Sequence, residues 1–101
     1  MLTTHLYQLD GKVHAIIPGR TENEDWHYSL GDKNNPAKAG KKLVKNVERD
    51  HDLTGIHLTP YSLNSLPEGA DPIDISTLEE IARSIKTGRS FFVSTNTTPQ
   101  A

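Results

Sequence analysis

The dipeptide Asp10-Gly11 constrains the fold of this chain more than any other feature of the sequence. It stands between residues 5–9 and 12–17, and polar and apolar side chains alternate in both segments. Asp-Gly tolerates the positive φ angles of a type I′ turn, and the alternation is typical of strands with one buried face. The sequence therefore predicts a β-hairpin, which Pro18-Gly19 ends.

Similar patterns predict three further strands and one helix. The strands are expected over 26–30, 53–58 and 89–94. The helix is expected over 77–87, because apolar residues recur there at the spacing of one helical face. These residues are Leu78, Ile81, Ala82 and Ile85.

Both ends of this helix carry terminal signals. Ser76 and Glu79 have the spacing of a capping box, which predicts the start of the helix. Lys86 is expected in the last turn, and Gly88 is expected to be the left-handed residue that ends it.

Residues 36–49 fit two structures. Asn35 followed by Pro36 is typical of a helix start, with an N-cap and a proline in the first turn. Gly40 weakens such a helix by about 1 kcal/mol, and residues 42–49 also fit an edge strand. Both alternatives stay open at this point.

These elements predict an α+β domain over residues 1–94. Its sheet is expected to be mostly antiparallel, with four to six strands and the C-terminal amphipathic helix packed on it. The polar tail over 95–101 is expected to be disordered.

Composition narrows the classes of function. The chain has 101 residues, 11 of them basic and 13 acidic, and no cysteine. This length suits one small domain, and the missing cysteine excludes a disulfide framework, a thiol nucleophile and a cysteine-bound metal. We expect a cytoplasmic protein with no cofactor and no membrane contact, and the sequence leaves its oligomeric state open.

The segment 53–93 carries a resemblance. Its helix reads Leu78-Glu79-Glu80-Ile81 and then Ile85-Lys86-Thr87-Gly88, and Phe91-Phe92-Val93 follows. This arrangement resembles the hairpin, helix and strand that end some small uncharacterised bacterial domains. The resemblance implies a fold fragment and no activity.

Charge is unevenly distributed along the chain. Residues 33–49 hold six basic residues against one acid, whereas residues 50–80 hold seven acids and no lysine or arginine. Such asymmetry predicts a positive and a negative patch on one small surface. The basic segment is a candidate contact for nucleic-acid phosphates. Its proposed binding residues are Lys38, Lys41, Lys42, Lys45 and Arg49.

The segment 61–74 is expected to be a long irregular loop, because it contains Pro67, Gly69 and Pro72. Apolar side chains among polar ones in such a loop mark protein interfaces when they stay exposed, or they fold back onto the core. The proposed binding residues here are Tyr61, Leu63 and Leu66. Our leading hypothesis from the sequence is a small non-catalytic protein that binds a larger protein, such as a bacterial or phage inhibitor or adaptor.

Histidines provide a catalytic alternative. His27 and His57 each precede a hydroxyl residue by two positions, Ser29 and Thr59 respectively. Two such tripeptides on adjacent strands resemble the two-histidine phosphoesterases, in which imidazoles act as acid and base and hydroxyls hold phosphate oxygens. A metal site at Asp50, His51, Asp52 and His57 is a weaker alternative, because no second pair at ligand spacing exists. We expect no metal.

Overall fold

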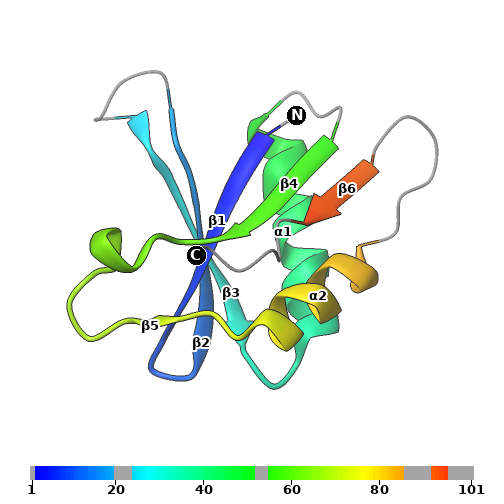
Figure 1. The fold of residues 1–101 in the computed structure, drawn as a ribbon. Coiled ribbons are helices and arrows are strands. Elements are labelled where there is room, and N and C mark those ends of the chain that lie inside the picture. Colours follow the sequence, from blue (N-terminus) through cyan, green and yellow to red (C-terminus); the bar gives the residue numbers. More distant parts are fainter. Residues whose placement is uncertain (1, 20–23, 52–54, 86–91, 96–101) are drawn as a thin grey trace.

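A computed structural model describes residues 2–19, 24–51, 55–85 and 92–95 of the chain (Figure 1). The elements are β1 (Leu2–Leu9), β2 (Lys12–Ile17), β3 (Trp26–Asp32), α1 (Pro36–Asp50), β4 (Gly55–Pro60), a 3₁₀ turn (Leu63–Ser65), β5 (Asp71–Pro72), α2 (Ile75–Ser84) and β6 (Phe92–Thr95).

The strands form one mixed sheet in the order β3-β2-β1-β4-β6, and the short β5 pairs with the end of β1. β1 and β2 are antiparallel, as are β2 and β3, whereas β4 runs parallel to both β1 and β6. The helix α1 provides the crossover that a parallel connection requires. The predicted α+β class, with a mostly antiparallel sheet and a C-terminal helix, is confirmed.

The hairpin between β1 and β2 has the predicted turn. Asp10 has φ of 53° and Gly11 has φ of 74°, which are the two positive angles of a type I′ turn. Two further strands end later than predicted: β3 continues to Asp32 and β4 to Pro60.

Residues 36–50 form a helix, which resolves the alternative between helix and edge strand. The side-chain oxygen of Asn35 accepts a hydrogen bond from the Lys38 amide at 3.3 Å, and Pro36 occupies the first turn. Gly40 is buried where α1 meets α2, and a Cβ atom there would collide with the Ser84 hydroxyl. The glycine that weakens the helix is therefore the residue that lets the two helices approach.

The helix α2 begins and ends earlier than predicted. Its N-cap is Asp74, so Ser76 and Glu79 lie within the helix and the predicted capping box is wrong. The Asp74 carboxylate makes no cap; it accepts a hydrogen bond from the buried Gln8 side chain of β1 at 3.4 Å. The helix therefore begins without a side-chain cap, and its N-cap residue instead contacts a strand far away in the sequence. The helix ends at Ser84, and the predicted last-turn and cap positions, Lys86 and Gly88, lie outside the described residues.

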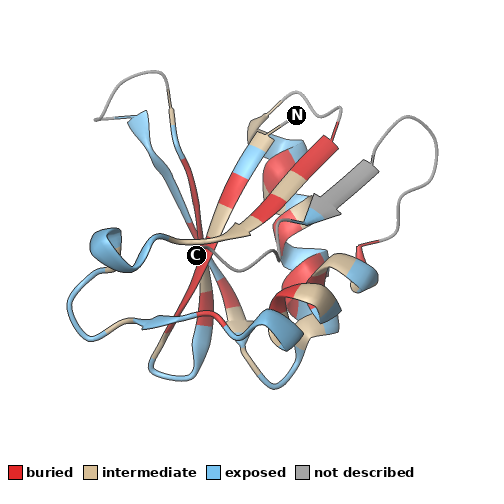
Figure 2. Cartoon of the chain, viewed as in Figure 1, coloured by how far each residue is buried: buried red, intermediate tan, exposed pale blue. Residues whose placement is uncertain are grey.

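Both helices pack on one face of the sheet, and the core lies between them and the strands (Figure 2). Buried residues from the two layers include Leu6, Ile56, Leu43 and Ile81. The segment 61–70, with its 3₁₀ turn, crosses the other face, on which the described residues place no α-helix (Figure 1). We call this other face the helix-free face. Thr95 is the last residue of β6 rather than the first of a tail, and residues 96–101 lie outside the described part.

Candidate functional site

The basic residues of α1 lie along one side of the helix. At about 100° per residue, they fall within an arc of roughly 100°. All of them are exposed, and the buried side of the helix, with Ala39, Leu43 and Val47, points the opposite way. We call this surface the basic face of α1. Its members are Lys38, Lys41, Lys42, Lys45 and Arg49.

The lysines of the basic face have no counter-ion within the described part of the chain, where the ion pairs are Arg49–Asp50 and Arg83–Glu79. Arg49, the fifth member of the basic face, does have a counter-ion: its guanidinium donates to both oxygens of Asp50 at 3.0 and 2.9 Å. This contact lowers the pKa of the Asp50 carboxyl. Among the described residues, four ammonium groups without an ion pair therefore outnumber the one carboxylate beside them, Glu48, which lines the adjoining pocket with Lys41 and Lys45.

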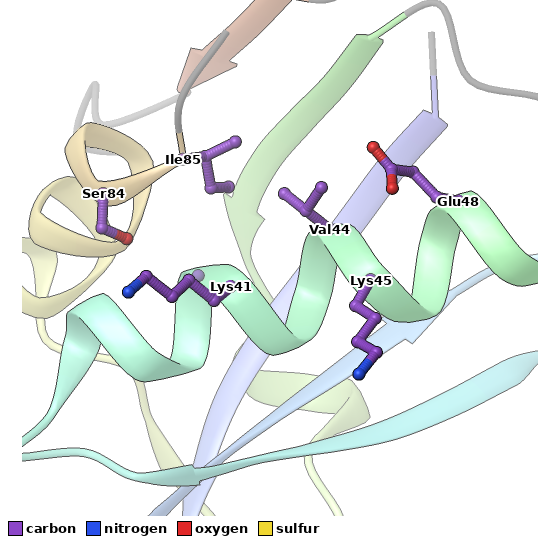
Figure 3. A pocket seen from close by; sticks show the side chains of 7 residues that line it. Lys41, Val44, Lys45, Glu48, Ser84 and Ile85 are labelled. Atoms are coloured by element: carbon purple, nitrogen blue, oxygen red, sulfur yellow. The ribbon is translucent and has the colours of Figure 1, made fainter.

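A small pocket adjoins the basic face. It lies between α1 and α2 and has a volume of about 350 Å³ (Figure 3). Val44 and Ile85 give it an apolar floor, and Lys41, Lys45 and Glu48 stand along its α1 side. The pocket extends the basic face toward α2 and does not form a separate enclosed site.

A polar cluster fixes the C-terminal end of α1 against β3. The Tyr28 hydroxyl donates to Asp50 at 2.9 Å and lies 3.3 Å from His51 Nε2. Burial and the hydrogen bond to Asp50 raise the pKa of Tyr28 to about 12. Trp26 packs edge-on against His51, with ring centroids 5.0 Å apart. Sequence reasoning missed this cluster, since it depends on how far α1 extends.

The structure separates the residues of the predicted phosphoesterase site. His27 and Ser29 lie on β3, whereas His57 and Thr59 lie on β4, and β2 and β1 stand between these strands. The expectation of adjacent strands is wrong. At about 4.8 Å per strand, β3 and β4 are roughly 14 Å apart, too far for two imidazoles to hold one phosphodiester.

A different histidine comes close to His57. In the parallel pairing of β1 with β4, Thr3 is opposite His57 and His5 is opposite Thr59. All four side chains share the helix-free face, because side chains on a strand alternate and Thr4 and Leu58 are buried in the core. We call Thr3, His5, His57 and Thr59 the His–Thr square. The sequence alone did not reveal it, since the pairing joins strands with a helix between them.

The surroundings of the His–Thr square are partly aromatic. The Tyr61 ring lies 5.4 Å from the His5 ring and 5.9 Å from the Tyr7 ring, and Tyr7 stacks on His14 at 5.3 Å. His5 is half-buried, and burial followed by the charge of His57 lowers the pKa of its imidazole.

The apolar residues of the segment 61–74 show both predicted outcomes, exposure to solvent and burial against the core. Ile73 is 4% exposed and belongs to the core, and Tyr61 and Leu66 are half-buried. Leu63, on the 3₁₀ turn, is 70% exposed. Most residues of the loop are therefore exposed, Ile73 anchors it to the core, and Leu63 is its one exposed large apolar side chain.

Comparison of the chain with protein-family models, with curated proteins and with solved structures found no significant match. Among the described residues, no group of three or more histidine or acidic side chains is placed to hold a metal ion. No helix in that part of the chain is long and apolar enough to cross a membrane.

Proposed function

We propose that this chain is a non-catalytic binding protein and that the phosphate backbone of a nucleic acid is its partner. The observation that carries the proposal is the alignment of Lys38, Lys41, Lys42 and Lys45 on one exposed side of α1. From the sequence we favoured a protein partner. The helical form of residues 36–50, which aligns these lysines, shifts the balance toward a polyanion, since Tyr61 and Leu66 of the loop are half-buried.

The dimensions of the basic face support this partner. The stretch from Lys38 to Arg49 extends about 16 Å at 1.5 Å per residue. Phosphates of one strand of a duplex rise about 3.4 Å each along the axis, so the basic face can follow several of them. Lysine ammonium groups on flexible side chains contact phosphates without reading bases, which predicts binding with little sequence preference.

Salt dependence of binding tests the proposal. We expect the wild-type protein to bind labelled duplex DNA or RNA at 50 mM KCl and to lose affinity steeply toward 200 mM, with a slope near −0.9 per phosphate neutralised. Each Lys→Gln substitution at 38, 42 and 45 should reduce this slope by about 1. Fluorescence anisotropy measures both quantities, and glutamine preserves helix propensity.

Lys12→Gln is the matched control, because Lys12 is an exposed lysine on β2 outside the basic face. It should leave the slope unchanged. Two outcomes would contradict the proposal: absence of binding at 50 mM KCl, or equal salt dependence of affinity in the wild type and in a variant with all three Lys→Gln substitutions.

A protein partner is the second candidate, and the exposed Leu63 favours it. An exposed apolar side chain gains free energy when a partner protein covers it and removes it from water. Stoichiometric capture of a protein by the wild type but not by Leu63→Ser, together with no nucleic-acid binding, would replace the first proposal with this one.

A further inference from the structure

We propose that the His–Thr square is a binding site for a phosphate group. It lies on the helix-free face, whereas the basic face of α1 lies on the other side of the sheet. The site is therefore independent of the proposed nucleic-acid contact, and either can fail without the other.

The register gives the site its donors. Thr3 opposes His57 and His5 opposes Thr59, so the two imidazoles occupy one diagonal of the square and the two hydroxyls the other. With strands about 4.8 Å apart and alternate residues about 6.6 Å apart along a strand, diagonal positions are about 8 Å apart, which leaves room for one tetrahedral anion between the two imidazoles. Protonated imidazoles and hydroxyls donate to phosphate oxygens, and charged donors form the stronger bonds.

The site is accessible from one side and walled on another. Thr3 is exposed, and His5, His57 and Thr59 are half-buried, so a ligand reaches the group without opening the fold. The Tyr61 ring packs against His5 on the side where the segment 61–70 crosses the sheet. Partial burial strengthens a hydrogen bond to an anion, because fewer waters compete for it.

Binding at this site is expected to depend on pH. Two positive imidazoles repel each other, and the lowered pKa of His5 reflects its burial and the charge of His57. A phosphate anion between the two rings offsets this repulsion, so it should raise the pKa of His5 and bind more tightly as the pH falls from 8 to 6. Among the described residues, the other titratable side chains on this face are Tyr7, Lys12, His14, His27, Asp32 and Tyr61, and Glu68 lies in the segment that crosses it.

The same linkage acts on stability. A histidine whose pKa is lowered in the folded state contributes stability that is complete above its unfolded value near 6.5 and is lost as the pH falls below it. A bound phosphate would offset this loss. Phosphate should therefore raise the melting temperature more at pH 6 than at pH 8.

Imidazole NMR provides the direct test. Inorganic phosphate is titrated into the wild-type protein at pH 6 and constant ionic strength, while the Cε1–Hε1 resonances of all five histidines are followed. We expect saturable shifts of His5 and His57 with a dissociation constant on the order of 1 mM. His5→Gln and His57→Gln should each weaken binding about tenfold, as loss of one charged donor predicts.

His27→Gln is the control, because His27 is exposed on the same face but lies on β3. It should leave the affinity unchanged. A phosphate monoester and a short single-stranded oligonucleotide, titrated in the same way, distinguish a terminal phosphate from a backbone diester. Equal affinity in all the histidine variants, or equal shifts at His27, would overturn the proposal, provided circular dichroism shows the variants folded.

Discussion

Tyr28 shows how one hydroxyl connects three elements. Its ring is buried in the core, while its hydroxyl donates to Asp50 at the end of α1 and lies beside His51. Asp50 in turn holds Arg49, so the bond from β3 also orients the last basic residue of the basic face. The hydroxyl therefore fixes the C-terminal end of α1 to the sheet.

Tyr28→Phe should lower the free energy of unfolding by about 1 kcal/mol at pH 8, because it removes this hydrogen bond and keeps the ring. The pKa of Tyr28 is raised from 10 to about 12, so its contribution is complete below pH 10 and is lost as the pH rises toward 12. Urea denaturation of the wild type between pH 8 and 11 measures this loss of stability. Tyr28→Phe should lack the part that comes from ionisation of Tyr28.

Ultraviolet titration of tyrosinate supplies the control for this prediction. Tyr7→Phe should retain the ionisation step near pH 12, whereas Tyr28→Phe should lack it. An unchanged titration curve in Tyr28→Phe would show that the step belongs to another group.

At the scale of the element, the contact between α1 and α2 depends on Gly40. The Ser84 hydroxyl donates to the Ile81 carbonyl at 2.7 Å and to the Pro36 carbonyl at 3.3 Å, directly above the glycine. These two bonds hold the hydroxyl where a new methyl group would lie. The close approach therefore leaves no space for a larger residue.

Gly40→Ala should destabilise the protein by about 1–3 kcal/mol, even though alanine favours a helix by about 1 kcal/mol. The collision with Ser84 outweighs the gain in propensity. The double variant Gly40→Ala/Ser84→Ala should recover part of the loss, and denaturant unfolding of the four proteins of this cycle measures the coupling. An increase in stability in the single variant would contradict the packing described here.

Structural features that depend on neighbouring residues were predictable from the sequence, whereas features that depend on contacts far apart in the sequence were not. Asp10-Gly11 acts through its own backbone, so the hairpin was predicted. Asn35-Pro36 marks the start of α1, but the sequence left a helix and an edge strand as open alternatives for this segment. The start of α2 was predicted wrongly: its N-cap, Asp74, makes no side-chain cap and instead contacts Gln8 on a strand far away in the sequence. The His–Thr square escaped for the same reason, since it exists only once β1 and β4 pair.

At the scale of the whole molecule, the strand order makes β1 the centre of the sheet. β1 pairs with β2 on one side and with β4 and β5 on the other, whereas β3 lies at one edge. Leu6 and Leu58, on the two central strands, are fully buried. Opening the sheet at β1 therefore requires the loss of most of the core.

Amide hydrogen exchange should reflect this order. We expect the hydrogen-bonded amides of β1 and β4 to exchange slowest, near the limit of global unfolding, and those of β3 and β6 to exchange faster. Exchange monitored by two-dimensional NMR gives the ranking residue by residue. Protection of β3 equal to that of β1 would contradict a peripheral position for β3.

The parallel pairing of β1 with β4 has a consequence for synthesis on the ribosome. The first hairpin can close as soon as Ile17 has emerged, but one side of β1 stays without a partner until the chain has passed Pro60. During that interval an apolar strand offers unpaired amides and carbonyls to any neighbouring nascent chain. Closure of this long-range pair, with its unfavourable loop entropy, should then limit the folding rate, and a chaperone that shields the open side of β1 should raise the yield of folded protein.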